Sequence, residues 1–158
     1  MRSLVLNVLV AVIWLLLQTQ PTLLDFFVGA ALGFLLLFLF RPVLHSGDYV
    51  RRVIAANVFV LLFAWEFLRA CVQLIRLTLF VPVDRLRPDF LIYDVSGLTR
   101  LEILLLSHCV SLTPGTCTVD ISHDFSRLYL HVLDCPDPAA VRRDIDNTLR
   151  RGILAFTR

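Results

Sequence analysis

The chain has 158 residues, of which 58% are hydrophobic and 18% are charged, and its mean hydropathy is +0.78. This balance is too apolar for an ordinary soluble domain of this size, so it excludes that class and predicts a membrane protein. The formal net charge is only +2.

The charged residues divide the chain into two parts. Residues 1–82 carry six arginines and three carboxylates, whereas residues 83–158 carry nine arginines and ten carboxylates. Dense mixed charge is typical of a surface that faces water. We therefore expect a membrane domain over residues 1–82 and a small α/β domain over residues 83–158, with the boundary near Pro82.

The first part contains two apolar runs separated by the polar stretch "QTQPT". With their flanking residues, each run approaches the ~20 residues that a helix needs to cross the hydrocarbon core. We predict two membrane helices over about residues 4–20 and 22–40, joined as a hairpin. Asp25, close to the tip, is interpreted as a helix-start charge near the membrane surface.

The second predicted helix carries two glycines four residues apart, Gly29 and Gly33. This spacing puts both on one face, where another helix can approach closely. The alternative of two glycines in a lipid-facing helix stays open, because the pattern is common.

Arginines flank the hairpin but are absent from its tip. Arg2 precedes the first helix, and Arg41, Arg51 and Arg52 follow the second. Because basic residues concentrate on the cytoplasmic side of a membrane, both ends of the pair are expected in the cytoplasm.

A third apolar segment predicts a helix over about residues 53–80. Four polar residues in it recur at spacings of three and four and form a stripe: Glu66, Arg69, Gln73 and Arg76. A full span would put the C-terminal domain outside the cell, whereas a helix partly embedded at the interface would keep that domain in the cytoplasm. We favour the partly embedded helix, because the arginines beyond residue 76 then lie inside.

Glu66 is the carboxylate expected in or near the membrane, where an ionisable group is a candidate for ion or proton traffic. The simpler interpretation is an ion pair with Arg69, one helical turn away.

The second part predicts the order β-α-β-β-α, giving a three-stranded sheet with helices on one face. "PDFLIYDVS" is typical of a strand, and Thr99 with Glu102 forms a capping box for the following helix. Two alternating segments around "HDFS" predict a hairpin, and Asp137-Pro138 begins the last helix. We expect Cys117 to face the core, Thr118 to lie opposite His131, and Asp120 to lie opposite Tyr129.

The stretch "SLTPGT" ends the first helix of this domain. Proline followed by glycine at the two central positions predicts a type II turn over Thr113, Pro114, Gly115 and Thr116, which leads directly into a strand.

No catalytic or metal-binding pattern emerges from the remaining residues. The four cysteines form no CxxC pair, and their spacings match no structural zinc site. His108 and Cys109 are adjacent, so on a helix they point about 100° apart and cannot act together. We expect neither an enzyme nor a cofactor, and no nucleic-acid partner.

The most specific stretch, "SHCVSLTPGTCTVDISHD" followed by "LYLHVLD", resembles the E subunit of the Mrp-type (Mnh, Pha) multisubunit Na+/H+ antiporters of bacteria. The likeness covers nearly the whole chain, including the apolar hairpin and the third apolar segment. Family members usually carry small or polar residues at the positions of His108 and Cys109, so the resemblance assigns those two no role.

This resemblance implies a multi-pass subunit of the bacterial cytoplasmic membrane, partnered by the other antiporter subunits and the lipid bilayer. Its implied role is accessory: assembly and stability of the complex, with modulation of transport left open. The Thr113–Thr116 turn would then fix how the C-terminal domain sits against the membrane helices.

Two other functions compete with this one. A free-standing membrane-anchored adaptor would be stable when expressed alone, whereas a subunit would aggregate or be degraded. A membrane-bound thiol or hydrolytic enzyme would need Cys109 or His108 for turnover.

Overall fold

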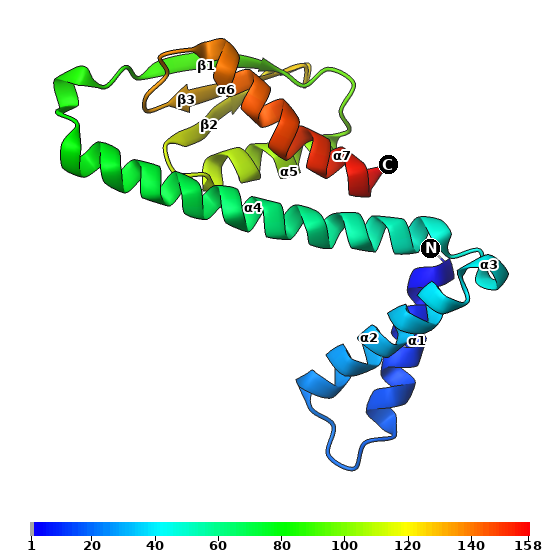
Figure 1. The fold of residues 1–158 in the computed structure, drawn as a ribbon. Coiled ribbons are helices and arrows are strands. Elements are labelled where there is room, and N and C mark those ends of the chain that lie inside the picture. Colours follow the sequence, from blue (N-terminus) through cyan, green and yellow to red (C-terminus); the bar gives the residue numbers. More distant parts are fainter. Residues whose placement is uncertain (1) are drawn as a thin grey trace. The chain divides into compact units, whose positions relative to one another are not determined.

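The computed structural model describes residues 2–158, which form mostly helices, a small three-stranded sheet and one long apolar helix (Figure 1). The elements are α1 (Arg2–Leu16), α2 (Leu23–Leu39), α3 (Arg41–Leu44), α4 (Gly47–Phe80), the 3₁₀-helix η1 (Val83–Arg85), β1 (Asp89–Asp94), α5 (Arg100–Leu112), β2 (Thr116–Ile121), β3 (Arg127–Val132), α6 (Pro138–Asp144), the π-helix η2 (Ile145–Arg150) and α7 (Arg151–Thr157). They group into two compact units that divide within α4, one ending at Ile54 and the other comprising Ala55–Arg158.

The first unit is built on the α1–α2 hairpin. Thr22 caps α2: its backbone N–H donates to the Asp25 carboxylate at 2.9 Å, and its hydroxyl accepts from the Asp25 N–H at 3.3 Å. This capping box confirms Asp25 as a helix-start charge. The helices have 15 and 17 residues, fewer than predicted, because the "QTQP" stretch before the cap stays outside both.

Helix α4 begins at Gly47, six residues before the predicted start at residue 53. His45 adopts a left-handed conformation with φ of 50° and ends α3, and the Ser46 hydroxyl donates to the Leu37 carbonyl at 2.7 Å. Among residues 2–158, α4 is the helix long and apolar enough to cross a membrane, while α1 and α2 are shorter apolar helices.

The sheet of the second unit has the antiparallel order β1-β3-β2, and α5, α6 and α7 cover one of its faces (Figure 1). The predicted order from β1 to the last helix is therefore observed. Buried residues of both layers form one core: Leu91, Tyr93, Val95, Ile103, Leu106, Val110, Leu128, Leu130, Val132, Cys135, Ile145, Leu149 and Ile153.

The predicted orientation of β2 is wrong. Cys117 and Val119 are exposed, whereas Thr116 and Thr118 face α5 and donate from their hydroxyls to the carbonyls of Val110 (2.7 Å) and Ser107 (3.1 Å). The register shifts between Thr118 and Asp120, which is a β-bulge. The two hydrogen bonds to α5 therefore orient β2 with its threonines toward the helix, opposite to the orientation that the alternation of apolar residues predicted.

The bulge also decides the hairpin register. Asp120 does pair with Tyr129, as predicted, but Cys117 rather than Thr118 lies opposite His131. The prediction held close to the turn, where Ser122 N–H donates to the Arg127 carbonyl at 2.9 Å, and failed beyond the bulge.

The last helix contains a wide π-helical segment, in which the Arg151 N–H donates to the Asp146 carbonyl five residues back. Its core residues Ile145, Leu149 and Ile153 are spaced by four, a step that drifts by about 40° in a regular α-helix. A wider turn holds more residues, so it keeps these side chains directed at the sheet.

Candidate functional site

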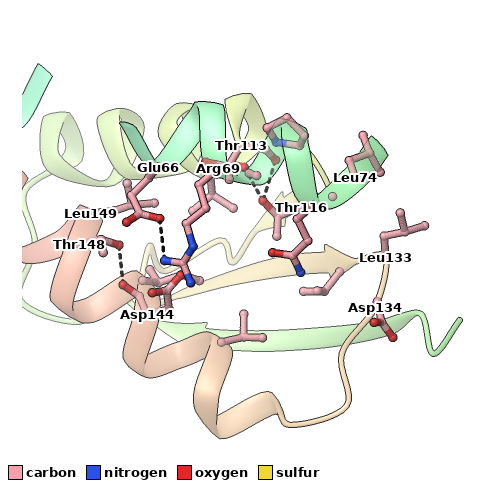
Figure 2. A pocket seen from close by; sticks show the side chains of 18 of the residues that line it. Glu66, Arg69, Leu74, Thr113, Thr116, Leu133, Asp134, Asp144, Thr148 and Leu149 are labelled. Carbon is pink, nitrogen blue, oxygen red and sulfur yellow. Dashed lines mark hydrogen bonds and ion pairs between the residues drawn. The ribbon is translucent and has the colours of Figure 1, made fainter. Parts of the chain in front are cut away.

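A cavity of about 200 Å³ lies within the second unit, between α4, the α5–β2 turn and the α6–η2 helix (Figure 2). The residues that line it include both the predicted turn and most of the predicted polar stripe: Glu66, Arg69, Ala70, Gln73, Leu74, Leu77, Val110, Thr113, Pro114, Gly115, Thr116, Val132, Leu133, Asp134, Val141, Asp144, Ile145, Thr148 and Leu149. The fold therefore brings together two features that are more than 35 residues apart in the sequence.

The α4 wall of the cavity carries Glu66, Arg69 and Gln73, while Arg76 is not among the lining residues. Arg69 Nη1 lies 3.4 Å from Glu66 Oε2, and both side chains are visible in Figure 2. Because the arginine is largely exposed, solvent screens this pair, which contributes less than about 1 kcal/mol to stability. The stripe thus faces the α/β domain of its own chain.

The second wall is the turn from Thr113 to Thr116. Gly115 has φ of +91°, and Thr116 N–H donates to the Thr113 carbonyl at 3.2 Å, which is the geometry of a type II turn. The Thr113 hydroxyl donates to the Cys109 carbonyl at 2.9 Å. Together with the Thr116–Val110 bond, this adds a side-chain donor to each of two carbonyls in the last turn of α5, which the Thr113 N–H also reaches.

Asp134, Asp144 and Thr148 complete the cavity on the side opposite α4 (Figure 2). The Thr148 hydroxyl donates to the Asp144 carbonyl, and Asp134 Oδ1 accepts from the Arg87 N–H at 3.4 Å. The cavity walls hold three carboxylates and one guanidinium, so this surface suits water or a cationic side chain better than an anion.

An aromatic contact, which the sequence did not predict, holds α4 on the domain. The Phe59 ring lies 5.5 Å from that of Phe156, and a Cβ at Gly152 would lie 2.3 Å from Phe59 Cδ2. A larger residue at position 152 would therefore force the Phe59 ring to move away from α7. In the sequence, the signal for this contact was Gly152, a glycine in the middle of a segment that otherwise favours a helix.

The long-range partners of the buried Glu102 carboxylate were not predicted from the sequence. This carboxylate is only 2% exposed and accepts four hydrogen bonds: from Thr99 N–H (2.7 Å), Thr157 Oγ1 (2.8 Å), and Arg158 Nε and Nη2 (3.2 Å each). Its bonds to Arg158, together with those to Thr99 and Thr157, lower the pKa of Glu102 to about 2 against the opposing effect of burial. Of these four hydrogen bonds, the predicted capping box accounted only for the one from the Thr99 N–H.

Gly29 and Gly33 lie in the first unit, where α1 packs against them. A Cβ at Gly29 would lie 2.9 Å from Ala11 Cα, and one at Gly33 would lie 2.2 Å from Asn7 Oδ1. The Asn7 amide donates to the Tyr49 hydroxyl at 2.8 Å. The glycine face is therefore occupied by the neighbouring helix of the same hairpin.

Comparison with known proteins identifies the family. A family model described as "Na+/H+ ion antiporter subunit" matches residues 7–156. The chain belongs to this antiporter-subunit family. A relative, the E subunit of the Na+/H+ antiporter of Alkalihalophilus pseudofirmus, is 34% identical over 156 residues, which cover 99% of this chain and 98% of the relative.

Two solved structures contain chains similar to this family member. A chain of the Mrp complex from Dietzia sp. DQ12-45-1b is 25% identical with a TM-score of 0.51, and the match covers 65% of this chain and 94% of that one. A chain of the archaeal membrane-bound sulfane sulfur reductase, a respiratory membrane complex, shares the fold with 17% identity and a TM-score of 0.56, covering 96% and 98%.

The residues proposed for the competing thiol or hydrolytic activity lie apart from the cavity. His108 Nδ1 is 2.8 Å from the Leu104 carbonyl of its own helix, and burial raises the pKa of the Cys109 thiol. A raised pKa keeps the thiol protonated and poorly nucleophilic. Among residues 2–158, no three His, Cys, Asp or Glu side chains are grouped to hold a metal ion.

Proposed function

We propose that this chain is an accessory membrane subunit of a multisubunit Na+/H+ antiporter and that it supports assembly and stability of the complex. The observation that carries the proposal is the match to the antiporter-subunit family over residues 7–156, together with 34% identity to an antiporter E subunit over 98% of its length. Its partners are then the other subunits of the antiporter and the bilayer.

The distribution of charge supports an accessory role rather than a transport path. A path for ions or protons through a membrane needs a series of ionisable groups. In the apolar segments of this chain, Asp25 caps α2 and Glu66 pairs with Arg69, so each carboxylate has a structural partner. Modulation of transport would then act through contacts with other subunits.

For the membrane topology, we take the α1–α2 hairpin to cross the bilayer with both ends in the cytoplasm. Their 15 and 17 residues are somewhat fewer than the ~20 of a full span, a mismatch that local thinning of the bilayer and flanking residues can absorb. Arg2 and Arg41 would lie at the cytoplasmic ends.

The second part of α4 is proposed to lie partly embedded at the cytoplasmic surface, with the α/β domain in the cytoplasm. Phe59 contacts Phe156 of α7, and Glu66 and Arg69 line the cavity with the α5–β2 turn. One face of this part of α4 therefore contacts a charged domain rather than lipid, which supports the interfacial placement over a full third span.

A pull-down from the native membrane tests the proposed function. The chain, tagged at its C-terminus, is purified in mild detergent and its companions are identified by mass spectrometry. Recovery of large multi-span antiporter subunits is expected. Recovery of the chain alone from well-solubilised membranes would instead favour the free-standing adaptor.

Labelling of Cys117 tests the topology separately. Its side chain is exposed, whereas Cys135 is buried. A membrane-impermeant maleimide should label Cys117 only after the cells are permeabilised, and a Cys117→Ser variant gives the background. Equal labelling of intact cells would place the domain outside and favour a third span.

A further inference from the structure

Arginines from three separate segments gather at one end of the first unit. Arg2 begins α1, Arg41 begins α3, and Arg51 and Arg52 lie in the second turn of α4; all four side chains are exposed. Because α1 and α2 run in opposite directions, α1 starts at the end of the hairpin where α2 finishes, beside α3 and the start of α4 (Figure 1). We call these four residues the arginine cluster.

Buried contacts hold the backbone that carries the arginine cluster. The Asn7 amide, which donates to the Tyr49 hydroxyl at 2.8 Å, joins α1 to the first turn of α4. Ser46 is only 1% exposed, and its hydroxyl bond to the Leu37 carbonyl fixes the turn between α2 and α4. Val50 is buried as well. The positions of the arginines therefore follow from the packing of this unit.

The charge at this end of the unit is strongly positive. Within residues 2–54 there are two carboxylates, and one of them, Asp25, caps α2 at the opposite end of the hairpin. The other, Asp48, lies 4.0 Å from Arg51 with both side chains exposed, a distance at which solvent weakens the ion pair. Four arginines beside one carboxylate favour an anionic partner.

Exposed apolar side chains beside the cluster distinguish a lipid from a soluble anion. Phe40, Val43 and Leu44, in and next to α3, are 53%, 72% and 41% exposed. The Arg41 guanidinium lies 5.5 Å from the centre of the Phe38 ring. Apolar side chains next to cations are typical of a segment that lies at the boundary between headgroups and acyl chains. A free phosphate would leave these apolar side chains in water.

The chemistry of arginine matches the phosphate of a lipid headgroup. A guanidinium presents parallel N–H donors that bind two phosphate oxygens at once, and it keeps its charge at every physiological pH. Basic residues placed between membrane helices at the cytoplasmic surface bind anionic headgroups. Each arginine near an anionic surface strengthens association about fivefold.

We propose that the arginine cluster and α3 form a binding site for a phospholipid whose headgroup carries a net negative charge. Arg41, Arg51 and Arg52 bind the phosphate, and Val43 and Leu44 lie against the first carbons of the acyl chains. The inference goes beyond the proposed function, because it assigns a lipid as a specific partner. It rests on the proposed crossing of the bilayer by the hairpin.

Native mass spectrometry of the full chain in mild detergent tests this site. The protein is titrated with phosphatidylglycerol or with phosphatidylcholine, and the affinity for the first bound lipid is measured for each. The variant is Arg51→Gln with Arg52→Gln. Arg142→Gln with Arg143→Gln is the matched control, because it removes two adjacent exposed arginines from α6 and changes the net charge equally.

We expect the wild type to bind phosphatidylglycerol more tightly than phosphatidylcholine, and the Arg51/Arg52 variant to lose at least about fivefold in affinity for phosphatidylglycerol alone. The control should bind as the wild type does. Lysines at positions 51 and 52 keep the charge without the bidentate geometry, so Arg51→Lys with Arg52→Lys should give an intermediate affinity. No preference in the wild type, or an equal loss in the control, would overturn the proposal.

The lipid content of the complex gives a second readout. Anionic phospholipid extracted with the complex from the pull-down should decrease in the Arg51/Arg52 variant and not in the control. Unchanged lipid in that variant would mean that groups of another subunit cover the arginines, which refutes the lipid site. The proposed function fails separately, if the wild-type pull-down recovers no antiporter subunits.

Discussion

The hairpin and the α/β domain differ in whether their buried polar atoms have hydrogen-bond partners. In the hairpin, Asn7 Oδ1 and Trp14 Nε1 are buried without a hydrogen-bond partner among the described residues, at the places where α1 meets Gly33 and Gly29. In the domain, the carboxylate of Glu102 is just as buried but accepts four hydrogen bonds.

This difference agrees with the proposed topology, in which the hairpin lies in lipid and the α/β domain in water. Helices surrounded by lipid gain little from burying apolar surface against one another, so close packing against small residues must hold them. A domain in water gains from its apolar core and can fix the ends of its helices with a saturated ionic network. The two units should therefore respond to different substitutions.

The largest expected effect is at Glu102. Glu102→Ala leaves the Thr99 N–H without its buried acceptor and removes the bonds from Thr157 and Arg158 that connect the end of α7 to α5, which should destabilise the domain by about 3 kcal/mol. Hydrogen exchange of the full chain in detergent measures this as faster exchange in α5 and α7, with α1 and α2 unchanged. Equal loss of protection in the hairpin would contradict the separation of the two units.

The same carboxylate predicts a dependence on pH. Its pKa is about 2 in the folded chain and near 4.5 when unfolded, so its contribution to stability is complete above pH 4.5 and is lost as the pH falls from 4.5 toward 2. Thermal unfolding of the domain should show this slope in the wild type and a shallower slope in Glu102→Gln, in which the remaining pH dependence comes from Asp94 and Asp124, whose pKa values are also lowered by hydrogen bonds.

A single methyl group should disturb the hairpin. Gly29→Ala places a Cβ 2.9 Å from the backbone of Ala11, so α1 and α2 must move apart at a cost of about 1–3 kcal/mol. Gly47→Ala is the matched control, because no atom lies within 4 Å of its added Cβ. Equal stability of the two variants, measured by circular dichroism during denaturant titration in micelles, would mean that close packing does not hold the hairpin.

Gly115→Ala should have a smaller effect, confined to the turn. Its Cβ would meet no other atom within 4 Å, but φ of +91° is strained for any L side chain and should cost about 1–2 kcal/mol. We expect a lower yield of assembled complex with unchanged ion selectivity. Normal assembly with altered selectivity would contradict a structural role for the Thr113–Thr116 turn.

The smallest effect is expected at Glu66. Glu66→Gln removes a solvent-screened ion pair worth less than about 1 kcal/mol, so stability and Na+/H+ exchange in vesicles should both remain close to wild type. A clear change in the sodium dependence of exchange would instead assign Glu66 to an ion path.

Local patterns in the sequence predicted the features that depend on neighbouring residues. The helix-start charge Asp25, the capping box at Thr99, the Pro114-Gly115 turn and the pairing of Asp120 with Tyr129 each involve groups within about a dozen residues. Such interactions form wherever those residues occur, because the geometry of the backbone alone brings them together.

The features that were missed depend on contacts between distant segments. The orientation of β2 is decided by hydrogen bonds from two threonines to α5, and Glu102 finds Arg158 at the other end of the domain. The cavity combines the polar stripe of α4 with a turn that no periodicity relates to it. The polar stripe and the turn could therefore each be predicted from the sequence, but not that both line the same cavity.

The wide turn of η2 has a consequence for how the length of this family member can vary. A π-helical segment accommodates one residue more than an α-helix over the same rise, and that residue bulges locally without displacing the helix on either side. Asn147 is exposed within it, so deleting Asn147 should leave α7 seated on the sheet, with core spacings of three and four. The same deletion in the regular helix α5 would rotate the residues beyond it by about 100° and misalign their core side chains. Gaps between relatives should therefore be tolerated at this turn and excluded from α5.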